Sequence, residues 1–316
     1  MLVGALVGLK HLWHLYREGR PRDPLRTMLQ RLVQSALAGD RIGSLFHGLV
    51  TFTPLITMFV ALKGDITRIH PFSWDRAFMN LGLQLGFGQH YWQILQPVLG
   101  HPPITAFLSI AYALWFPVLF GCLFWQLTRP TNDLTRSQYL LSFAFAWFFG
   151  GFVLATVFSS AGPCYYEHVV GGPNPYGPLL HYLRVTSQHW PVWTIPAQDT
   201  LWHSYVTGVG DVEGISAMPS MHVTIATLMA LVAWRTNRNL GIAFSTFAFI
   251  ILIGSIMLGW HYSADGLAGI ALGYLFWTLA GKVSHMWARD RDRLFARPAR
   301  GRSALTHTLS QADSVA

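Results

Sequence analysis

Two short segments near the end of the chain contain histidines that could carry out phosphoryl or acyl transfer. The first is Ser216-Ala217-Met218-Pro219-Ser220-Met221-His222, and the second is Gly259-Trp260-His261-Tyr262-Ser263-Ala264-Asp265. Each histidine stands between a polar loop and a long apolar run. Asp265 follows His261 by one helical turn. A histidine with a carboxylate partner, facing a second histidine at a membrane surface, indicates group transfer on lipids.

The second segment supplies a nucleophile and a group that orients it. An ionisable pair at a membrane edge is costly unless it has a function. One ring nitrogen of His261 can bond the Asp265 carboxylate, which fixes the tautomer and leaves the other nitrogen free to attack. Asp265 would then orient His261 as the aspartate of a serine-protease triad orients its histidine. The alternative is a self-satisfied pair that joins two helices.

The first segment supplies a site for an anion and a proton donor. Ser220 is a good helix N-cap, and Pro219 helps to set the start of the helix. Free N–H groups of the first turn, together with the serine hydroxyl, could hold a phosphate there. His222 beside that phosphate could protonate a leaving oxygen. The alternative is a capped helix with an incidental interfacial histidine.

The composition places both segments in a membrane protein. The chain of 316 residues is 52% hydrophobic and only 11% charged, whereas soluble domains carry roughly 25% charged residues. So few charges disagree with the alternative of buried helices in a large soluble protein. Because lipid offers no hydrogen-bond partners, each span must be helical. We expect an all-α, polytopic membrane protein with six transmembrane helices, at about residues 42–62, 104–127, 138–160, 221–235, 240–258 and 264–284.

Charge placement predicts the orientation of these spans. Most of the 22 basic residues precede the first span, follow the last, or lie between the second and third and the fourth and fifth. The positive-inside rule then makes both termini cytoplasmic. His222, His261 and Asp265 fall on the outer side, whether periplasmic, extracellular or lumenal. The net charge of +8 is explained by orientation and by anionic lipids, so no nucleic-acid partner is expected.

The spans also divide the chain. Residues 1–41 read as a cytoplasmic segment with interfacial amphipathic helices, and 42–285 as a six-span catalytic domain with its core at 104–285. Residues 286–316 are predicted to form a basic, disordered cytoplasmic tail. The loop at 63–103 reads as an aromatic interfacial helix rather than a seventh span. No prediction of oligomeric state follows.

Both histidine segments resemble signatures of a known family. Ser216-x-x-Pro219-Ser220-x-His222 resembles the second signature of the type 2 phosphatidic-acid phosphatase superfamily. Gly259-Trp260-His261-Tyr262-x-x-Asp265-x-x-Ala268-Gly269 is similar to the third, in the form found in inositol phosphorylceramide synthases and their bacterial relatives. Weaker similarities lie at 160–166 and 198–202. The resemblance implies a six-helix core and a phosphohistidine mechanism without metal or cofactor, with His261 as nucleophile, Asp265 as its orienting base and His222 as general acid.

The departures from the family pattern bear on the substrate. Phosphatases of the superfamily carry an arginine six residues before the nucleophilic histidine, where this chain has Ser255. Arg129-Pro130 mimics another basic motif, but the expected topology puts it on the inner side. Because a dianionic phosphomonoester needs a dense set of cations, the missing cations favour a phosphodiester donor with a single charge.

The outer loop between about 171 and 214 is rich in turn formers and aromatic residues, and a loop of this length is usually functional. We expect it to cover the site. With Ser220 and the Pro-Tyr segment, it supplies the candidate substrate contacts, although each loop residue could equally be an ordinary surface residue. The candidates are Ser220, Pro163, Tyr165, Tyr166, His168, Arg184 and Asp199.

Three functions fit these residues. The favoured one is a headgroup phosphotransferase that takes a phospholipid donor and a lipid or polyol hydroxyl as acceptor. The second is a lipid phosphatase, in which water resolves the same adduct. The third is a membrane transporter or scaffold that uses the His–Asp pair as a proton relay. The Pro-Ser-x-His start of a helix has no purpose in such a relay, which argues against the third.

Overall fold

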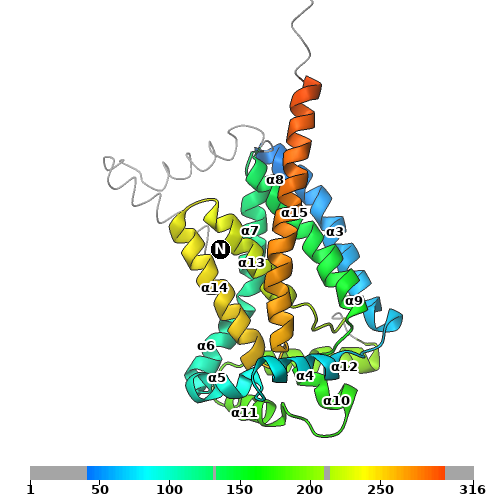
Figure 1. Cartoon of the computed structure of the whole chain (residues 1–316), viewed down its shortest axis with the longest axis vertical. Coiled ribbons are helices and arrows are strands. Elements are labelled where there is room, and N and C mark those ends of the chain that lie inside the picture. Colours follow the sequence, from blue (N-terminus) through cyan, green and yellow to red (C-terminus); the bar gives the residue numbers. More distant parts are fainter. Residues whose placement is uncertain (1–40, 131–132, 210–213, 296–316) are drawn as a thin grey trace, which may run out of the picture.

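The described residues form a helical bundle with shorter helices across one end. A computed structural model of the protein describes residues 41–130, 133–209 and 214–295, and this part contains helices and no strand. The long helices α3, α7, α8, α14 and α15 run along the bundle, and α4, α5 and α10 to α12 lie across its lower end in Figure 1. Only two short stretches inside the catalytic region therefore fall outside the description.

Five helices in the described part are long and apolar enough to cross a membrane, as expected of an integral membrane protein. The second of these five is continued by a second helical segment, and the third by a π-helical segment and a short α-helix. Their segments are α3 (Arg41–Ile69), α6 and α7 (Pro102–Ala113, Trp115–Leu127), α8, η1 and α9 (Leu134–Phe145, Ala146–Leu154, Ala155–Val157), α14 (Arg238–Met257) and α15 (Ser263–Phe295).

The expected count of six spans is not confirmed, because the helix expected at 221–235 is short. It is α13 (Met221–Trp234), with 14 residues, or about 21 Å at 1.5 Å per residue, against a bilayer core of about 30 Å. It packs mainly against α14 and α15, and most of its residues are buried. The loop before it is enclosed too, since Ile215, Ala217 and Ser220 are buried. Irregular backbone is tolerated at membrane depth where protein surrounds it.

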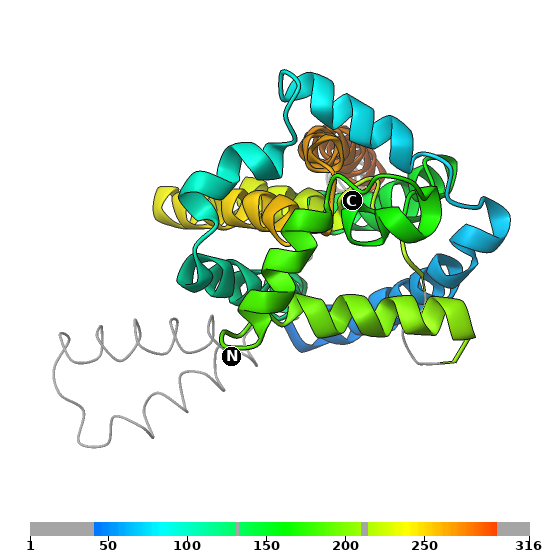
Figure 2. The same ribbon diagram turned by 90° about the horizontal axis from the view of Figure 1, so that it is seen from below.

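The shorter helices form a layer over the end of the bundle where α13 and α15 begin. Residues 63–103 contain two helices across this end rather than one, α4 (Asp75–Leu85) and α5 (Tyr91–Leu99). The view from below in Figure 2 shows this layer around the axis of α15. Its other members are η2 (Pro163–Tyr165), α10 (Tyr166–Val170), α11 (Gly177–Ser187) and α12 (Thr194–Thr207).

Two regions of the expected organisation lie largely outside the described residues. Of the interfacial segment at 1–41, only residue 41 is described, as the start of α3. At the other end, α15 continues to Phe295, beyond residue 285 where the catalytic domain is expected to end. The first part of the expected disordered tail is therefore helical, and residues 296–316 lie outside the description.

Candidate active site

The start of α13 holds His222 against two aromatic rings. Ser220 caps the helix, and its Oγ accepts a hydrogen bond from the Val223 N–H at 3.4 Å. The His222 ring stacks on Tyr112 with centroids 4.4 Å apart and lies 4.3 Å from the ring of Trp115. The Trp115 indole N–H also donates to the His222 carbonyl at 2.9 Å. The α6–α7 span therefore fixes both the backbone and the ring of His222.

The turn between α14 and α15 presents His261. Its side chain is only 7% exposed, and its backbone N–H donates to the Ser255 carbonyl at 3.0 Å. The Nδ1 atom of His261 lies 2.7 Å from the carbonyl oxygen of Ala217. A carbonyl oxygen can only accept a hydrogen bond, so this contact assigns the proton to Nδ1. The Nε2 atom then keeps its lone pair, as a nucleophile requires.

Asp265 lies farther from His261 than the Ala217 carbonyl does. Its Oδ2 atom is 3.5 Å from Nδ1 of His261, which is long for a hydrogen bond. The same oxygen accepts from the Tyr262 N–H at 2.9 Å. The side chain is fully buried, and its Oδ1 has no hydrogen-bond partner among the described residues. A backbone carbonyl thus holds the His261 ring most closely, while Asp265 adds a buried carboxylate beside it.

The two histidine motifs are joined to each other. The His222 and His261 rings lie 6.1 Å apart between centroids, at 62°. Besides the Ala217–His261 contact, the Ser220 N–H donates to the backbone carbonyl of Asp265 at 3.2 Å. The loop before α13 and the first turn of α15 therefore form one unit, which holds the two imidazoles near each other.

A comparison with known protein families shows which family contains these motifs. A sequence model of the PAP2 superfamily matches residues 76–279, well over half of the chain. The chain belongs to the PAP2 superfamily. Membership indicates phosphatase or phosphotransferase activity on lipid phosphates in a bilayer. The match is to the superfamily and includes His222, His261 and Asp265. Comparisons with curated proteins and with solved structures give no match.

The structure adds Lys63, a cation that the sequence did not assign to this PAP2 site. Lys63 lies near the end of α3 and is half-buried. The loop that leads to the first motif packs on it, since a Cβ at Gly214 (φ +89°) would lie 2.5 Å from the Lys63 carbonyl oxygen. More than 150 residues separate Lys63 from His222, so no local spacing could have paired them.

Asp75 is a second residue that the sequence did not assign. It is the first residue of α4, only 2% exposed. Its carboxylate accepts from the Ala161 and Gly162 N–H groups at 2.9 to 3.0 Å and from the Tyr262 hydroxyl at 2.8 Å. Burial raises the pKa of Asp75, and these hydrogen bonds oppose the rise. Asp75 thereby ties α4 and the 160–166 segment to the residue next to His261. An aspartate in a first helical turn is common, so its burial left no signal in the sequence.

The weaker motifs support the His261 turn rather than line the space between the histidines. A Cβ at Gly162 (φ +100°) would lie 2.6 Å from the Trp260 carbonyl oxygen, so that turn requires glycine. The Gln198 side chain donates to the Leu258 carbonyl at 2.9 Å, and the Gln198 backbone carbonyl accepts from the Tyr165 hydroxyl at 2.9 Å. Tyr165 is buried.

Of the other predicted substrate contacts, some are buried and some are exposed. Pro163 and Tyr166 are buried, and Tyr166 packs edge-on against Tyr176. His168 is exposed and stacks on Trp202 at 4.5 Å.

Arg184 pairs with Asp199 through contacts of 2.9 and 3.2 Å, with side chains 59% and 53% exposed. Within the described residues, His168, Arg184 and Asp199 make no hydrogen bond, ion pair or ring contact with the two active-site histidines. Ser220, by contrast, caps the helix whose first turn contains His222.

No metal cluster is present in the part of the chain that the structure describes. No group of three or more His, Cys, Asp or Glu side chains there is arranged to hold a metal ion. In particular, the buried Asp265 approaches His261 but not His222. The expectation of a metal-free reaction stays a prediction.

Proposed function

We propose that this protein is a lipid headgroup phosphotransferase, similar in reaction to the inositol phosphorylceramide synthases, that works through a phosphohistidine intermediate. The observation that carries the proposal is the state of His261. Its Nδ1 is held at 2.7 Å by the Ala217 carbonyl, while the His222 ring faces it at 6.1 Å between centroids. One imidazole is thereby prepared to attack, and a second stands opposite to move a proton.

The first half of the reaction forms the adduct. The Nε2 lone pair of His261 attacks the phosphorus of a phospholipid phosphodiester, and the bond from phosphorus to the diacylglycerol oxygen breaks. His222, entering this step protonated, gives its proton to that oxygen. The headgroup phosphoryl then remains on His261, whose positive charge the buried Asp265 carboxylate stabilises from 3.5 Å.

The second half returns the enzyme to its starting state. A lipid or polyol hydroxyl attacks the same phosphorus and gives its proton to His222, and the bond from phosphorus to His261 breaks. The product is a new phosphodiester. His222 thus serves first as acid and then as base, and no oxidant, metal or cofactor takes part in the balance.

The charges around the site favour a phosphodiester donor. Lys63 lies beside the loop that leads to His222, and the first turn of α13 offers free N–H groups beside Ser220. Position 255, where the phosphatases have an arginine, is a buried serine that donates to the Leu252 carbonyl. One lysine and one helix end match a single negative charge better than a phosphomonoester dianion, which needs several cations.

A phosphatase is the second candidate, and one feature favours it. A small cavity beside His261 is lined in part by His90, Tyr176 and Ser263, and has a volume of about 10 Å³. Such a space admits roughly one water molecule. Water held there could resolve the phosphohistidine, with His222 as base. Acting on a lipid phosphomonoester, the same catalytic residues would then release inorganic phosphate into solution.

One experiment separates these two functions. Purified full-length protein in vesicles is given a glycerophospholipid labelled in its phosphate, with and without a panel of lipid and polyol acceptors. The proposal expects label in a new phosphodiester only when an acceptor is present, and none with His261→Ala. Acceptor-independent release of inorganic phosphate from a labelled lipid phosphomonoester, tested in parallel, would support the phosphatase instead.

A further inference from the structure

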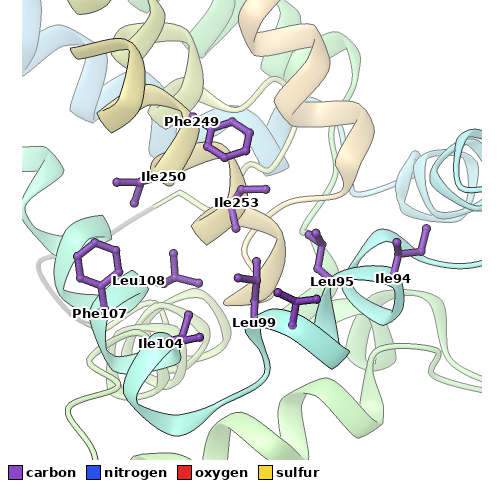
Figure 3. Close-up of a pocket in the computed structure, with 10 residues that line it drawn as sticks. Ile94, Leu95, Leu99, Ile104, Phe107, Leu108, Phe249, Ile250 and Ile253 are labelled. Atoms are coloured by element: carbon purple, nitrogen blue, oxygen red, sulfur yellow. The ribbon is translucent and has the colours of Figure 1, made fainter. Parts of the chain in front are cut away.

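A large apolar cavity lies beside the candidate active site. It has a volume of about 430 Å³, within the range of roughly 300–1,000 Å³ that holds small ligands. Helices α5, α6 and α14 form its walls, and Figure 3 shows their side chains converging on it. Every lining residue is apolar: Ile94, Leu95, Val98 and Leu99 from α5, Ile104, Phe107 and Leu108 from α6, and Phe249, Ile250 and Ile253 from α14.

The position of the cavity selects an apolar chain as its occupant. Both α6 and α14 belong to segments that are long and apolar enough to cross a membrane. Among the lining residues, Phe107 of α6 and Phe249 of α14 are 54% and 63% exposed, on the face of those segments that hydrocarbon would cover, and Val98 of α5 is 68% exposed. No polar group lines the cavity, so a headgroup or a soluble partner would lose its hydrogen bonds on entering. A lipid chain that moves in sideways from the bilayer loses none.

Each wall of the cavity leads to the active site within one helical turn. On α14, Ile253 lines the apolar cavity, and Ile256 lines the small cavity beside His261. On α5, Leu95 lines the apolar cavity, and Trp92 lines the small cavity beside His261. Positions three apart in a helix lie on the same side and about 4.5 Å apart along its axis.

The third wall reaches His222 instead. Leu108 of α6 lines the apolar cavity, and Tyr112, one turn later on the same helix, stacks on the His222 ring. Gly254 of α14 packs against both, since its Cβ would lie 3.4 Å from the Tyr112 ring and 3.8 Å from the Leu108 carbonyl oxygen. The apolar cavity therefore adjoins both catalytic histidines.

Trp92 lines the small cavity that contains His261. Its side chain is only 8% exposed, and its indole N–H has no hydrogen-bond partner among the described residues. An unpaired buried donor is costly, and this one lies on the wall of the cavity that contains His261. In an ester-linked phospholipid, the carbonyl that could accept this hydrogen bond lies between the phosphate and the acyl chain.

We propose that the apolar cavity binds an acyl chain of the phospholipid donor, with the Trp92 N–H bonded to the ester carbonyl and the phosphate at His261. The inference rests on the proposed function. It adds that the donor's acyl chain positions the phosphorus. Because bilayer lipid is as apolar as the cavity, the chain gains little free energy on transfer. The cavity acts by alignment, so its loss lowers turnover of long-chain donors.

Filling the cavity tests the inference. Ile253→Trp should lower kcat/KM for a long-chain donor by about tenfold or more, since small misplacements of a reacting group carry effects of this size. A short-chain, water-soluble donor should be affected less than about twofold, because its phosphate does not depend on the cavity. Ile242→Trp is the matched control, with the same change on the same helix at a site 48% exposed that does not line the cavity. Equal losses on both donors, or a loss that follows the acceptor's chain instead, would overturn the proposal.

A binding measurement keeps the inference separate from the chemistry. A phospholipid with a photoreactive group on its acyl chain should label residues of α5, α6 and α14 in both the unmodified protein and the inactive His261→Ala protein. Label elsewhere in both proteins would contradict the cavity assignment even if phosphotransfer occurs. Label in the cavity without phosphotransfer would uphold it and reject the transferase.

The Trp92 contact has its own readout. Replacing the donor's ester with an ether removes the carbonyl, and should cost the unmodified protein about fivefold in kcat/KM, the size of one hydrogen bond. Trp92→Phe should show no such preference. If Trp92→Phe still preferred the ester donor, a group other than Trp92 would be donating the hydrogen bond to the carbonyl.

Discussion

The two histidine motifs and the α10–α12 layer are both rich in polar side chains, yet these side chains are held differently. His261 and Asp265 are buried, and backbone groups of Ala217 and Tyr262 fix their positions. Arg184 and Asp199 are more than half exposed and pair with each other. A buried polar side chain needs hydrogen-bond partners in the protein, and these partners fix its position. An exposed pair can bond to water instead, so the protein constrains its position less. Burial with a fixed backbone partner therefore separates the catalytic candidates from the surface pairs better than residue type does.

After loss of His261, which should abolish turnover, removal of the general acid is the largest change expected at the site. His222→Ala should lower kcat by about 10²–10⁴-fold, the usual size of general acid–base catalysis. A donor with a good leaving group needs no proton at the departing oxygen, so it should recover part of this loss. The two donors are compared in steady-state assays of the same protein. An equal loss on both would assign His222 to binding or packing instead.

Lys63 sharpens the comparison, because α3 carries both a half-buried and an exposed cation. Lys63→Met should lower kcat/KM by about 10–100-fold, because it removes the lysine charge that the proposal assigns to the substrate phosphate. Arg68→Met is the matched control on the same helix, at a side chain 76% exposed and paired with Asp65, and should stay within about twofold. Kinetics in vesicles at constant ionic strength decide between them. Similar losses in the two variants would remove the distinction between buried and exposed charge.

The exposed pair should give the smallest effect. Arg184→Ala breaks its contacts with Asp199, and surface pairs contribute about 0–1 kcal/mol. We expect kcat/KM within about threefold of the unmodified protein and a similarly small change in Tm. A loss comparable to that of Lys63→Met would mean that the α11–α12 surface meets the substrate, and that exposure is a poor guide to function here.

The sequence predicted the parts of this protein that depend on local spacing. His222, His261 and Asp265 stand in short motifs, and five of the expected spans are recovered as apolar helices of sufficient length. Lys63 and Asp75 were missed because tertiary packing alone brings them to the site.

Two further differences have physical causes. The helix α13 is not counted as a span because it has only 14 residues, whereas the apolar run in the sequence does not show where its helix begins and ends. The closest partner of His261 is the Ala217 backbone carbonyl. Any residue has such a carbonyl, so the sequence pointed to Asp265 instead.

The central claim is that His261 forms a covalent bond to phosphorus. The most direct measurement is a brief exposure of the purified protein to phosphate-labelled phospholipid with acceptor withheld, followed by a test for acid-labile, base-stable label on the protein. The account predicts such label on the unmodified protein, its loss on addition of acceptor, and its absence in His261→Ala. Equal label in His261→Ala would place the nucleophile elsewhere, and a protein that turns over without any label would contradict the phosphohistidine.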